Sequence, residues 1–247
     1  MPELGIIGGT GLTEFQQGVI TGSRDTPYGD SAAELVVSDV ADCKVVFMAR
    51  HGVPHQLPPH KVNYRANIWA MHAVGVRQII AVNAVGAIPA AWLPGSLVIP
   101  DQIVDYTYGR EPSFCDGKNG ELQHIDFTEP YSAPLRQSLI KAAAQSHCDV
   151  IDGGVYGVTQ GPRLETAAEI NRMERDGCDL AGMTAMPEAA LARELGMEYA
   201  MLCVVVNPAA GRSDQPITLE EIHQVLEQGI TKVRAILTHL PQVLRWS

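Results

Sequence analysis

The sequence has no excess of positive charge, and this absence excludes several classes of partner. Its 28 acidic residues outnumber its 18 basic residues, which gives a net charge of −10 and a pI near 5.2. An acidic protein lacks the general electrostatic attraction that binds nucleic-acid backbones or anionic lipids. We therefore expect neither a nucleic acid nor a membrane as partner, and any bound anion must sit in a local basic pocket.

Cysteine motifs and long apolar runs are also missing. The five cysteines are widely spread, odd in number and without a Cys-x-x-Cys pair, which indicates reduced packing thiols and favours the cytoplasm. The N-terminal residues lead into a strand pattern without a basic leader, and no apolar run approaches the roughly 20 residues that cross a bilayer. Both observations disfavour secretion and membrane insertion.

What the chain does contain is an alternation of short β-branched runs with helical patterns, typical of an α/β fold with its sheet between helices. No linker, low-complexity segment or fixed-period repeat is present, so residues 1–247 are expected to form a single domain. After a first strand at 4–7, strands are predicted at 34–39, 44–49, 78–83, 96–99, 153–159, 178–183 and 199–207, with helices at 63–74, 166–175 and 187–195. A last helix follows Thr218, which forms a capping-box pattern with Glu221. One apolar stripe at helical spacing, mostly expected in the core, runs along this helix: Leu219, Ile222, Leu226, Val233, Leu237 and Leu240. The least regular stretch, 106–131, is expected to be a lid or a subunit contact.

The first strand ends in a glycine-rich loop, Leu4–Leu12, with the sequence LGIIGGTGL. Glycines let the backbone N–H groups approach a ligand closely, and the hydroxyl of Thr10 adds a donor, which favours phosphate. The alternative is that the glycines only permit a turn. Since the loop has neither G-x-G-x-x-G spacing nor the lysine of a P-loop, it needs partners from elsewhere in the chain.

Three further strand ends offer such partners: Arg50 and His51, then Asn83, Ala84 and Gly86, then Thr184, Pro187 and Glu188. Ligands of α/β proteins bind at the ends of strands, so we expect these groups to converge. Arginine offers a planar fork to phosphate oxygens, and histidine can donate from a ring nitrogen. Taken alone, an Arg-His pair at a strand end is more often a surface pair, but four converging strand ends are far more specific.

These motifs resemble one family along nearly the whole chain. GIIGGTGL, ARHG, PHKVNYRANIWAM, NAVGAI, PGSLVIPDQ, GPRLET and GMTAMPEAALARE occur in the order and spacing of the trimeric purine nucleoside phosphorylase and methylthioadenosine phosphorylase family. The resemblance implies a mixed, twisted sheet that closes towards a barrel flanked by helices, and a homotrimer with sites near its interfaces. It assigns phosphate binding to Thr10, Arg50, His51, Ala84 and Thr184, the ribose wall to Met183, and a contact with a neighbouring subunit's site to His124.

The resemblance also indicates which purine is bound. Methylthioadenosine phosphorylases carry Asp-x-Asp where this chain has Asn207, Pro208 and Ala209, and a serine where it has Glu165. Glu165 and Asn207 instead match the positions at which inosine and guanosine phosphorylases recognise a 6-oxopurine, and Ala209 is expected to line the same pocket.

Hydrogen-bond chemistry agrees with that assignment. A 6-oxopurine presents N1–H as a donor to the carboxylate of Glu165, whereas the N1 of adenine presents a lone pair that a carboxylate repels. The amide of Asn207 can donate to N7 or O6. Each unsatisfied buried group costs roughly 1–3 kcal/mol, so two mismatches give discrimination of about a thousandfold. The alternative for Glu165 is an acid that stabilises the N-terminus of the helix at 166–175, which is compatible with base recognition.

The sugar end of the substrate is predicted from the start of the last helix. Nucleoside phosphorylases of the family have a histidine there for the ribose 5′-hydroxyl, whereas methylthio enzymes have an apolar residue, and this chain has Leu219. An unpartnered hydroxyl against leucine costs about 1–3 kcal/mol, while a methylthio group is stabilised by burial. The alternative is that Leu219 is simply the first core residue of its helix.

Together these features predict reversible phosphorolysis of 5′-methylthioinosine, with inorganic phosphate as co-substrate and Asn207 as the catalytic group that stabilises the departing purine. His51, His55, His60 and His72 show no metal-ligand spacing with carboxylates, so we expect no metal and no cofactor. Four alternatives stay open: methylthioadenosine phosphorylase, a general inosine or guanosine phosphorylase, a nucleosidase that uses water, and a nucleotide-binding module without catalysis.

Overall fold

The centre of the protein is one mixed β-sheet. The structure is a computed structural model that describes residues 3–8, 12, 18–41, 43–117, 122–214 and 218–244, with the side chain of Leu219 left out. Along the sheet the strands follow the order β10-β8-β13-β7-β1-β6-β5-β2. Their bounds are β1 Leu4–Gly8, β2 Val19–Thr21, β5 Leu35–Val40, β6 Cys43–Ala49, β7 Gln78–Ala87, β8 Leu97–Ile99, β10 Ile151–Asp152 and β13 Glu198–Pro208. A separate hairpin joins β3 (Asp25–Thr26) to β4 (Gly29–Asp30).

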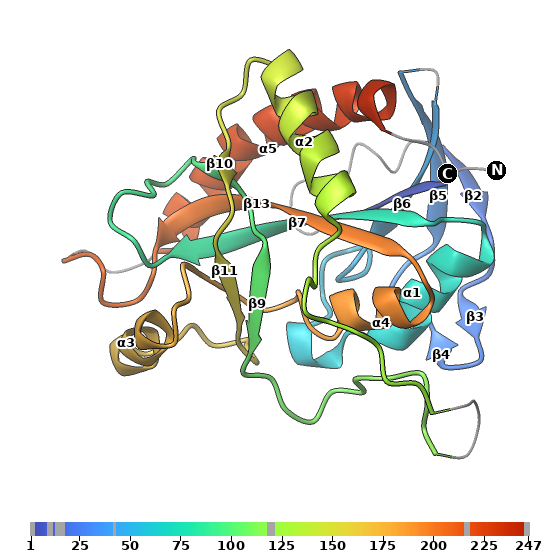
Figure 1. The fold of residues 1–247 in the computed structure, drawn as a ribbon, viewed down its shortest axis with the longest axis horizontal. Coiled ribbons are helices and arrows are strands. Elements are labelled where there is room, and N and C mark those ends of the chain that lie inside the picture. The colour runs from blue at the N-terminus through green and yellow to red at the C-terminus, as the bar shows by residue number, and fades with distance from the viewer. Residues whose placement is uncertain are drawn as a thin grey trace.

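The sheet branches at the carboxyl end of β7. There β12 (Leu180–Gly182) pairs antiparallel with Gly86 and Ala87, and β11 (Val155–Val158) runs parallel to both β12 and β9 (Gln102–Asp105). Since β8 lies in one arm, β9 in the other, and only two residues separate them in the chain, the two arms curl towards each other (Figure 1). The expected mixed, twisted sheet closing towards a barrel is confirmed, without a complete ring of strand pairs within the described ranges.

Helices cover both faces of the sheet (Figure 1). Helices α2 (Ala133–Gln145) and α5 (Leu219–Val243) pack on one face, and α1 (Tyr64–Ala73) and α4 (Glu188–Glu194) on the other. Strand β1 shows how the sequence permits this, because Ile6 faces α2 and α5 whereas Ile7 faces α1 and α4. Side chains alternate across a strand, so a strand buried on both faces is apolar at every position. Helix α3 (Ala167–Arg175) lies beside the β11–β12 arm.

The helix ends carry the side chains that satisfy free backbone N–H groups. Thr166 and Glu169 form a complete capping box at α3, and the Thr218 hydroxyl accepts from the backbone N–H of Glu221 at α5. Along α5, the predicted apolar stripe is buried at Leu226, Val233, Leu237 and Leu240. Each such side chain contributes roughly 1.5–3 kcal/mol when fully buried, so the stripe holds α5 on the sheet.

Two further observations concern the cysteines and the length of the helices. All five cysteines are free, and Cys178 and Cys203 are buried. None of the helices in the described ranges is both long and apolar enough to cross a bilayer.

Candidate active site

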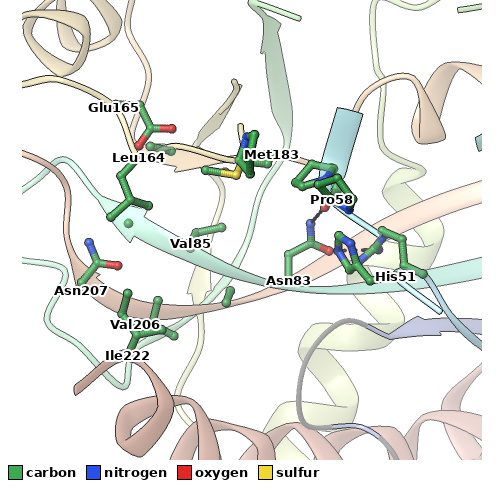
Figure 2. Close-up of a pocket in the computed structure, with 18 of the residues that line it drawn as sticks. His51, Pro58, Asn83, Val85, Leu164, Glu165, Met183, Val206, Asn207 and Ile222 are labelled. Carbon is green, nitrogen blue, oxygen red and sulfur yellow. Dashed lines mark hydrogen bonds between the residues drawn. The ribbon is translucent and has the colours of Figure 1, made fainter. Parts of the chain in front are cut away.

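A cavity of about 400 Å³ lies where the carboxyl ends of β6, β7, β12 and β13 meet. Its wall is completed by the loop at 55–59, by Pro162, Leu164 and Glu165 after β11, and by one residue of α5. Figure 2 shows Glu165 and Asn207 at one end of this cavity and His51 and Asn83 at the other. Its volume and its polar ends fit a small molecule with different hydrogen-bonding groups at each end.

Most of the residues that the sequence singled out line this one cavity. The lining includes Arg50, His51, Ala84, Glu165, Met183, Thr184, Asn207 and Ala209. Thr10 and the side chain of Leu219 lie outside the described residues. His124 is exposed and does not line this cavity.

Arg50 is fully buried and bonded to Glu188. Its Nε donates to Glu188 Oε2 at 2.7 Å and its Nη2 to Oε1 at 2.9 Å, a bidentate ion pair between side chains that are 1% and 0% exposed. Nη2 also lies 3.2 Å from Asn83 Oδ1, and Nη1 donates to the Val82 carbonyl at 3.3 Å. Although burial alone lowers the pKa of Arg50, Glu188 raises it above its ordinary value. The planar fork thus serves Glu188, and within the described residues one Nη1 hydrogen is left for a ligand.

His51 is neutral, with a defined tautomer. Its Nδ1 lies 2.8 Å from the Leu57 carbonyl, which can only accept, so Nδ1 carries the proton. Burial, followed by the charges of Arg50 and His55, lowers the pKa of His51 to about 4. At neutral pH its Nε2 therefore has a lone pair. The ring of His55 stacks on it at 4.4 Å and also lines the cavity.

Thr184 is oriented by Asn83. The Asn83 amide group donates to Thr184 Oγ1 and, at 3.3 Å, to the Tyr156 hydroxyl, while its Oδ1 accepts from Arg50. Because Thr184 Oγ1 accepts one bond here, its own hydrogen is available to an anion in the cavity. Asn83 therefore links the buried ion pair to the hydroxyl at the cavity wall.

Glu165 is held by Thr159 at the far end of the cavity. The Thr159 hydroxyl donates to Glu165 Oε1 at 2.5 Å, which leaves Oε2 to accept from a ligand. Among the described residues, no basic side chain is hydrogen-bonded to this carboxylate; the Arg163 guanidinium instead pairs with Glu169. Glu165 is thus a carboxylate with acceptor capacity facing a small-molecule cavity.

Asn207 reaches the cavity because the strand is irregular at that point. Pairing between β13 and β7 passes from Val205–Val85 to Asn207–Gly86, so Val206 is an extra residue. The bulge lets consecutive residues, Val206 and Asn207, line one cavity. Nδ2 of Asn207 donates to the Pro208 carbonyl at 2.6 Å, leaving Oδ1 and one N–H hydrogen for a ligand.

Sequence reasoning missed several wall residues. Ile222 was assigned to the core stripe of α5, yet it is half-buried and lines the cavity below Val206 (Figure 2). The available signal was its position one helical turn after Leu219, on the same face. Leu164 also lines the cavity, and Thr159 is hydrogen-bonded to Glu165. No local sequence pattern indicated either residue.

The residues that the structure describes contain no group of three or more metal-ligating side chains that could hold a metal ion.

A cavity at the strand ends of a mixed α/β sheet is typical of an enzyme that acts on a small molecule. Comparison with known proteins agrees with this interpretation. Residues 3–241 match a protein family described as "Phosphorylase superfamily", so the chain belongs to that superfamily. A protein of Pseudomonas syringae named probable S-methyl-5′-thioinosine phosphorylase is 54% identical over 237 residues, 95% of this chain and 96% of that protein.

Two further relatives widen the comparison. The 6-oxopurine nucleoside phosphorylase of Pyrococcus furiosus is 42% identical over 250 residues, 98% of this chain and 94% of that protein. Methylthioadenosine phosphorylase from Schistosoma mansoni, solved in complex with tubercidin, superposes with a TM-score of 0.89 at 31% identity, covering 97% of this chain and 90% of that one.

Proposed function

We propose that residues 1–247 form one nucleoside phosphorylase domain that cleaves 5′-methylthioinosine with inorganic phosphate and releases hypoxanthine and 5-methylthioribose 1-phosphate. One observation carries this proposal. Glu165 and Asn207 both lie at one end of a cavity whose other end holds Arg50, His51 and Thr184. The names of the Pseudomonas and Pyrococcus relatives, one a probable methylthioinosine and one a 6-oxopurine phosphorylase, support it.

The phosphate end supplies complementary hydrogen bonds. Thr184 donates its hydroxyl hydrogen, Arg50 donates its remaining Nη1 hydrogen, and the lone pair on His51 Nε2 accepts the hydrogen of a hydrogen phosphate ion. The backbone of Ala84, which is exposed at the cavity, and the hydroxyl of Thr10 complete the proposed set. The ion pair with Glu188 neutralises much of the Arg50 charge, so phosphate recognition depends on directed hydrogen bonds more than on net charge.

Phosphate itself is the nucleophile in this proposal. One of its oxygens attacks C1′ while the bond from C1′ to N9 breaks, and the bonding electrons of that bond pass to the purine. Phosphate bound beside C1′ stabilises the positive charge that develops on the sugar and fixes the direction of attack. The free N–H of Asn207 donates to N7 or O6 and stabilises the negative charge on the departing base.

The purine is selected by Glu165. Its free Oε2 accepts N1–H of a 6-oxopurine, and the hydroxyl of Thr159 holds the other oxygen in place. Adenine places a lone pair against that carboxylate, an unmatched contact that costs at least about 1–3 kcal/mol. Although the Schistosoma methylthioadenosine phosphorylase shares the fold, this carboxylate favours the 6-oxopurine over the 6-aminopurine.

The sugar substituent meets an apolar wall. Leu164, Met183, Val206 and Ile222 line the cavity, and we propose that Leu219 adds to this apolar wall because it lies one turn before Ile222 on α5. A methylthio group is stabilised by burial there, whereas a 5′-hydroxyl without a partner is penalised. This wall favours methylthioinosine over inosine.

The assembly and setting are part of the same proposal. We propose a cytoplasmic homotrimer that needs phosphate as co-substrate and no cofactor, in which His124 reaches the site of a neighbouring subunit. The exposed position of His124, away from its own chain's cavity, supports a role at an interface.

One assay tests the function. Release of free base is measured from methylthioinosine, methylthioadenosine and inosine, each with and without phosphate. We expect phosphate-dependent release of hypoxanthine, fastest from methylthioinosine. Release that does not depend on phosphate would identify a nucleosidase, tight purine binding without cleavage would identify a binding module, and preference for methylthioadenosine or inosine would identify one of the two other phosphorylases.

A further inference from the structure

One arginine of the segment at 106–131, Arg110, is hydrogen-bonded to two loops that form the site. Arg110 lies between the loop that follows β11 and the loop that follows β12, and its guanidinium donates to backbone carbonyls of both. Nη2 donates to Thr159 and Gln160 at 3.3 and 3.0 Å, whereas Nη1 donates to Met183 at 2.9 Å and to Met186. One planar group thus joins two loops that are separate in the sequence.

Those two loops carry the two ends of the cavity. The purine loop, Thr159–Glu165, presents Glu165, and the phosphate loop, Gly182–Pro187, presents Met183 and Thr184. They also pack directly on each other at Gly161, which has a φ of +59° and whose added Cβ would lie 2.5 Å from the sulfur of Met183. The separation between the loops therefore depends on close contacts, and Arg110 supplies the hydrogen bonds across it.

The surroundings of Arg110 require arginine. Beyond the four carbonyls, Nε donates to the Gln160 side chain at 3.2 Å and the guanidinium lies over the ring of Tyr64, with 5.4 Å to its centroid. All these partners are uncharged, so the residue does not act as half of an ion pair. A lysine has three donors on one atom and cannot reach both loops in the same way, whereas a guanidinium presents five donors in a fixed plane.

We propose that Arg110 is a positioning residue that sets the distance between the purine-binding and phosphate-binding ends of the site. It touches neither substrate, and it acts through the backbone of the two loops. The identity of the two ends rests on the function proposed above. Because reacting groups must be aligned closely, a shift of about 1 Å between the loops reduces kcat/KM by about a hundredfold.

The test compares Arg110→Met and Arg110→Lys with a matched control, Arg193→Met. Arg193 is also a half-buried arginine that donates to two carbonyls, of Asp126 and Glu129, but both belong to the segment at 106–131 and neither lines the cavity. We expect kcat/KM for methylthioinosine to fall about a hundredfold in Arg110→Met, mainly through kcat. Arg110→Lys should recover only part of it, and Arg193→Met should stay within about threefold of wild type.

Chemical rescue separates positioning from general stability. In Arg110→Ala, low concentrations of guanidinium chloride should restore part of kcat, and the same salt should not increase the activity of wild type or of Arg193→Met. Equal activity in the Arg110→Met and Arg193→Met proteins would overturn the inference. So would an activity loss in Arg110→Ala that follows the fraction of unfolded protein and is not rescued.

The wild-type protein keeps this test independent of the substrate assignment. If it prefers another nucleoside, the proposed substrate is wrong and the same variants are compared on that nucleoside. If it cleaves none, the proposed function fails. Calorimetric binding of hypoxanthine in the presence of phosphate then replaces kcat/KM, and unchanged binding in Arg110→Met overturns the inference.

Discussion

The guanidinium of Arg50 and the carboxylate of Glu188, 138 positions apart in the sequence, form a bidentate ion pair with N–O distances of 2.7 and 2.9 Å. Neither side chain is more than 1% exposed, and the Tyr199 hydroxyl donates to the same carboxylate at 2.9 Å. Removing charges from water is costly, so such a pair is stable only when both members are present. The pair fixes Arg50 at the cavity wall before any ligand arrives.

Glu188→Gln is expected to lower the free energy of unfolding by about 3–5 kcal/mol, because it leaves the charge of Arg50 buried without a counter-ion. Added phosphate should raise the melting temperature of this variant more than that of wild type, since the anion partly replaces the carboxylate. Chemical denaturation and thermal melts measure both effects. Asp39→Asn is the control, because it removes the exposed pair with Lys44 and should cost less than about 1 kcal/mol.

Glu165→Gln is expected to reduce the preference for methylthioinosine over methylthioadenosine by about a hundredfold, because an amide can donate to the N1 of adenine. The ratio of kcat/KM for the two nucleosides measures this. Thr159→Val should change the ratio in the same direction but by less, since it frees the carboxylate without removing it. An unchanged ratio in Glu165→Gln would rule out base recognition by this residue.

Asn207→Ala is expected to lower kcat by about a hundredfold or more while the KM for phosphate changes little, because in the proposed mechanism the amide acts on the departing purine. Steady-state kinetics with phosphate as the varied substrate separate the two constants. Normal turnover combined with weaker phosphate binding would show that this role is wrong.

Leu219→His is expected to raise the kcat/KM of inosine relative to methylthioinosine by about tenfold, because an imidazole gives the 5′-hydroxyl a partner. Ile222→Ala, which shortens the described apolar wall without adding a polar group, should lower activity on methylthioinosine and give inosine no such gain. If both variants gave the same ratio as wild type, the sugar assignment would fail.

His51 is expected to make the folded protein less stable in mild acid. Burial and the charge of Arg50 lower its folded pKa from 6.5 to about 4, so between these values the unfolded chain binds a proton that the folded chain does not. The contribution of neutral His51 to the free energy of unfolding is complete above about pH 6.5. It is lost as the pH falls towards 4, by up to about 3 kcal/mol. In urea denaturation across this pH range, the free energy of unfolding should change less with pH for His51→Gln than for wild type.

Much of the fold could be predicted because its signals are local. Helix α1 lies within the predicted range 63–74, and β13 differs by one residue at each end from the predicted 199–207. Helix α2 was not predicted, although Ser132 caps it and Leu135, Leu139 and Ala142 follow at helical spacing. Strand β9 was also missed, because Pro100 and Asp101 interrupt the run that begins with β8.

The site was harder to predict where it depends on tertiary contacts. Strand-end motifs predicted that Arg50, Ala84 and Thr184 converge, since those motifs mark where strands stop. The family resemblance added Glu165 and Asn207, and all five residues line one cavity. No local pattern could show that the fork of Arg50 binds Glu188, or that Arg110 joins two loops. Such pairings depend on how distant segments meet, and a single sequence does not record that.

Because Val206 is an extra residue in β13, the site depends on the number of residues in this strand as well as on their side chains. Deleting that valine would restore regular pairing between β13 and β7 and place the asparagine directly after Val205, in the position that Val206 now occupies. The strands would remain joined and the asparagine would still be present in the sequence. The amide would nevertheless move from its present place in the cavity, so a length change at this point is expected to be more damaging than most substitutions.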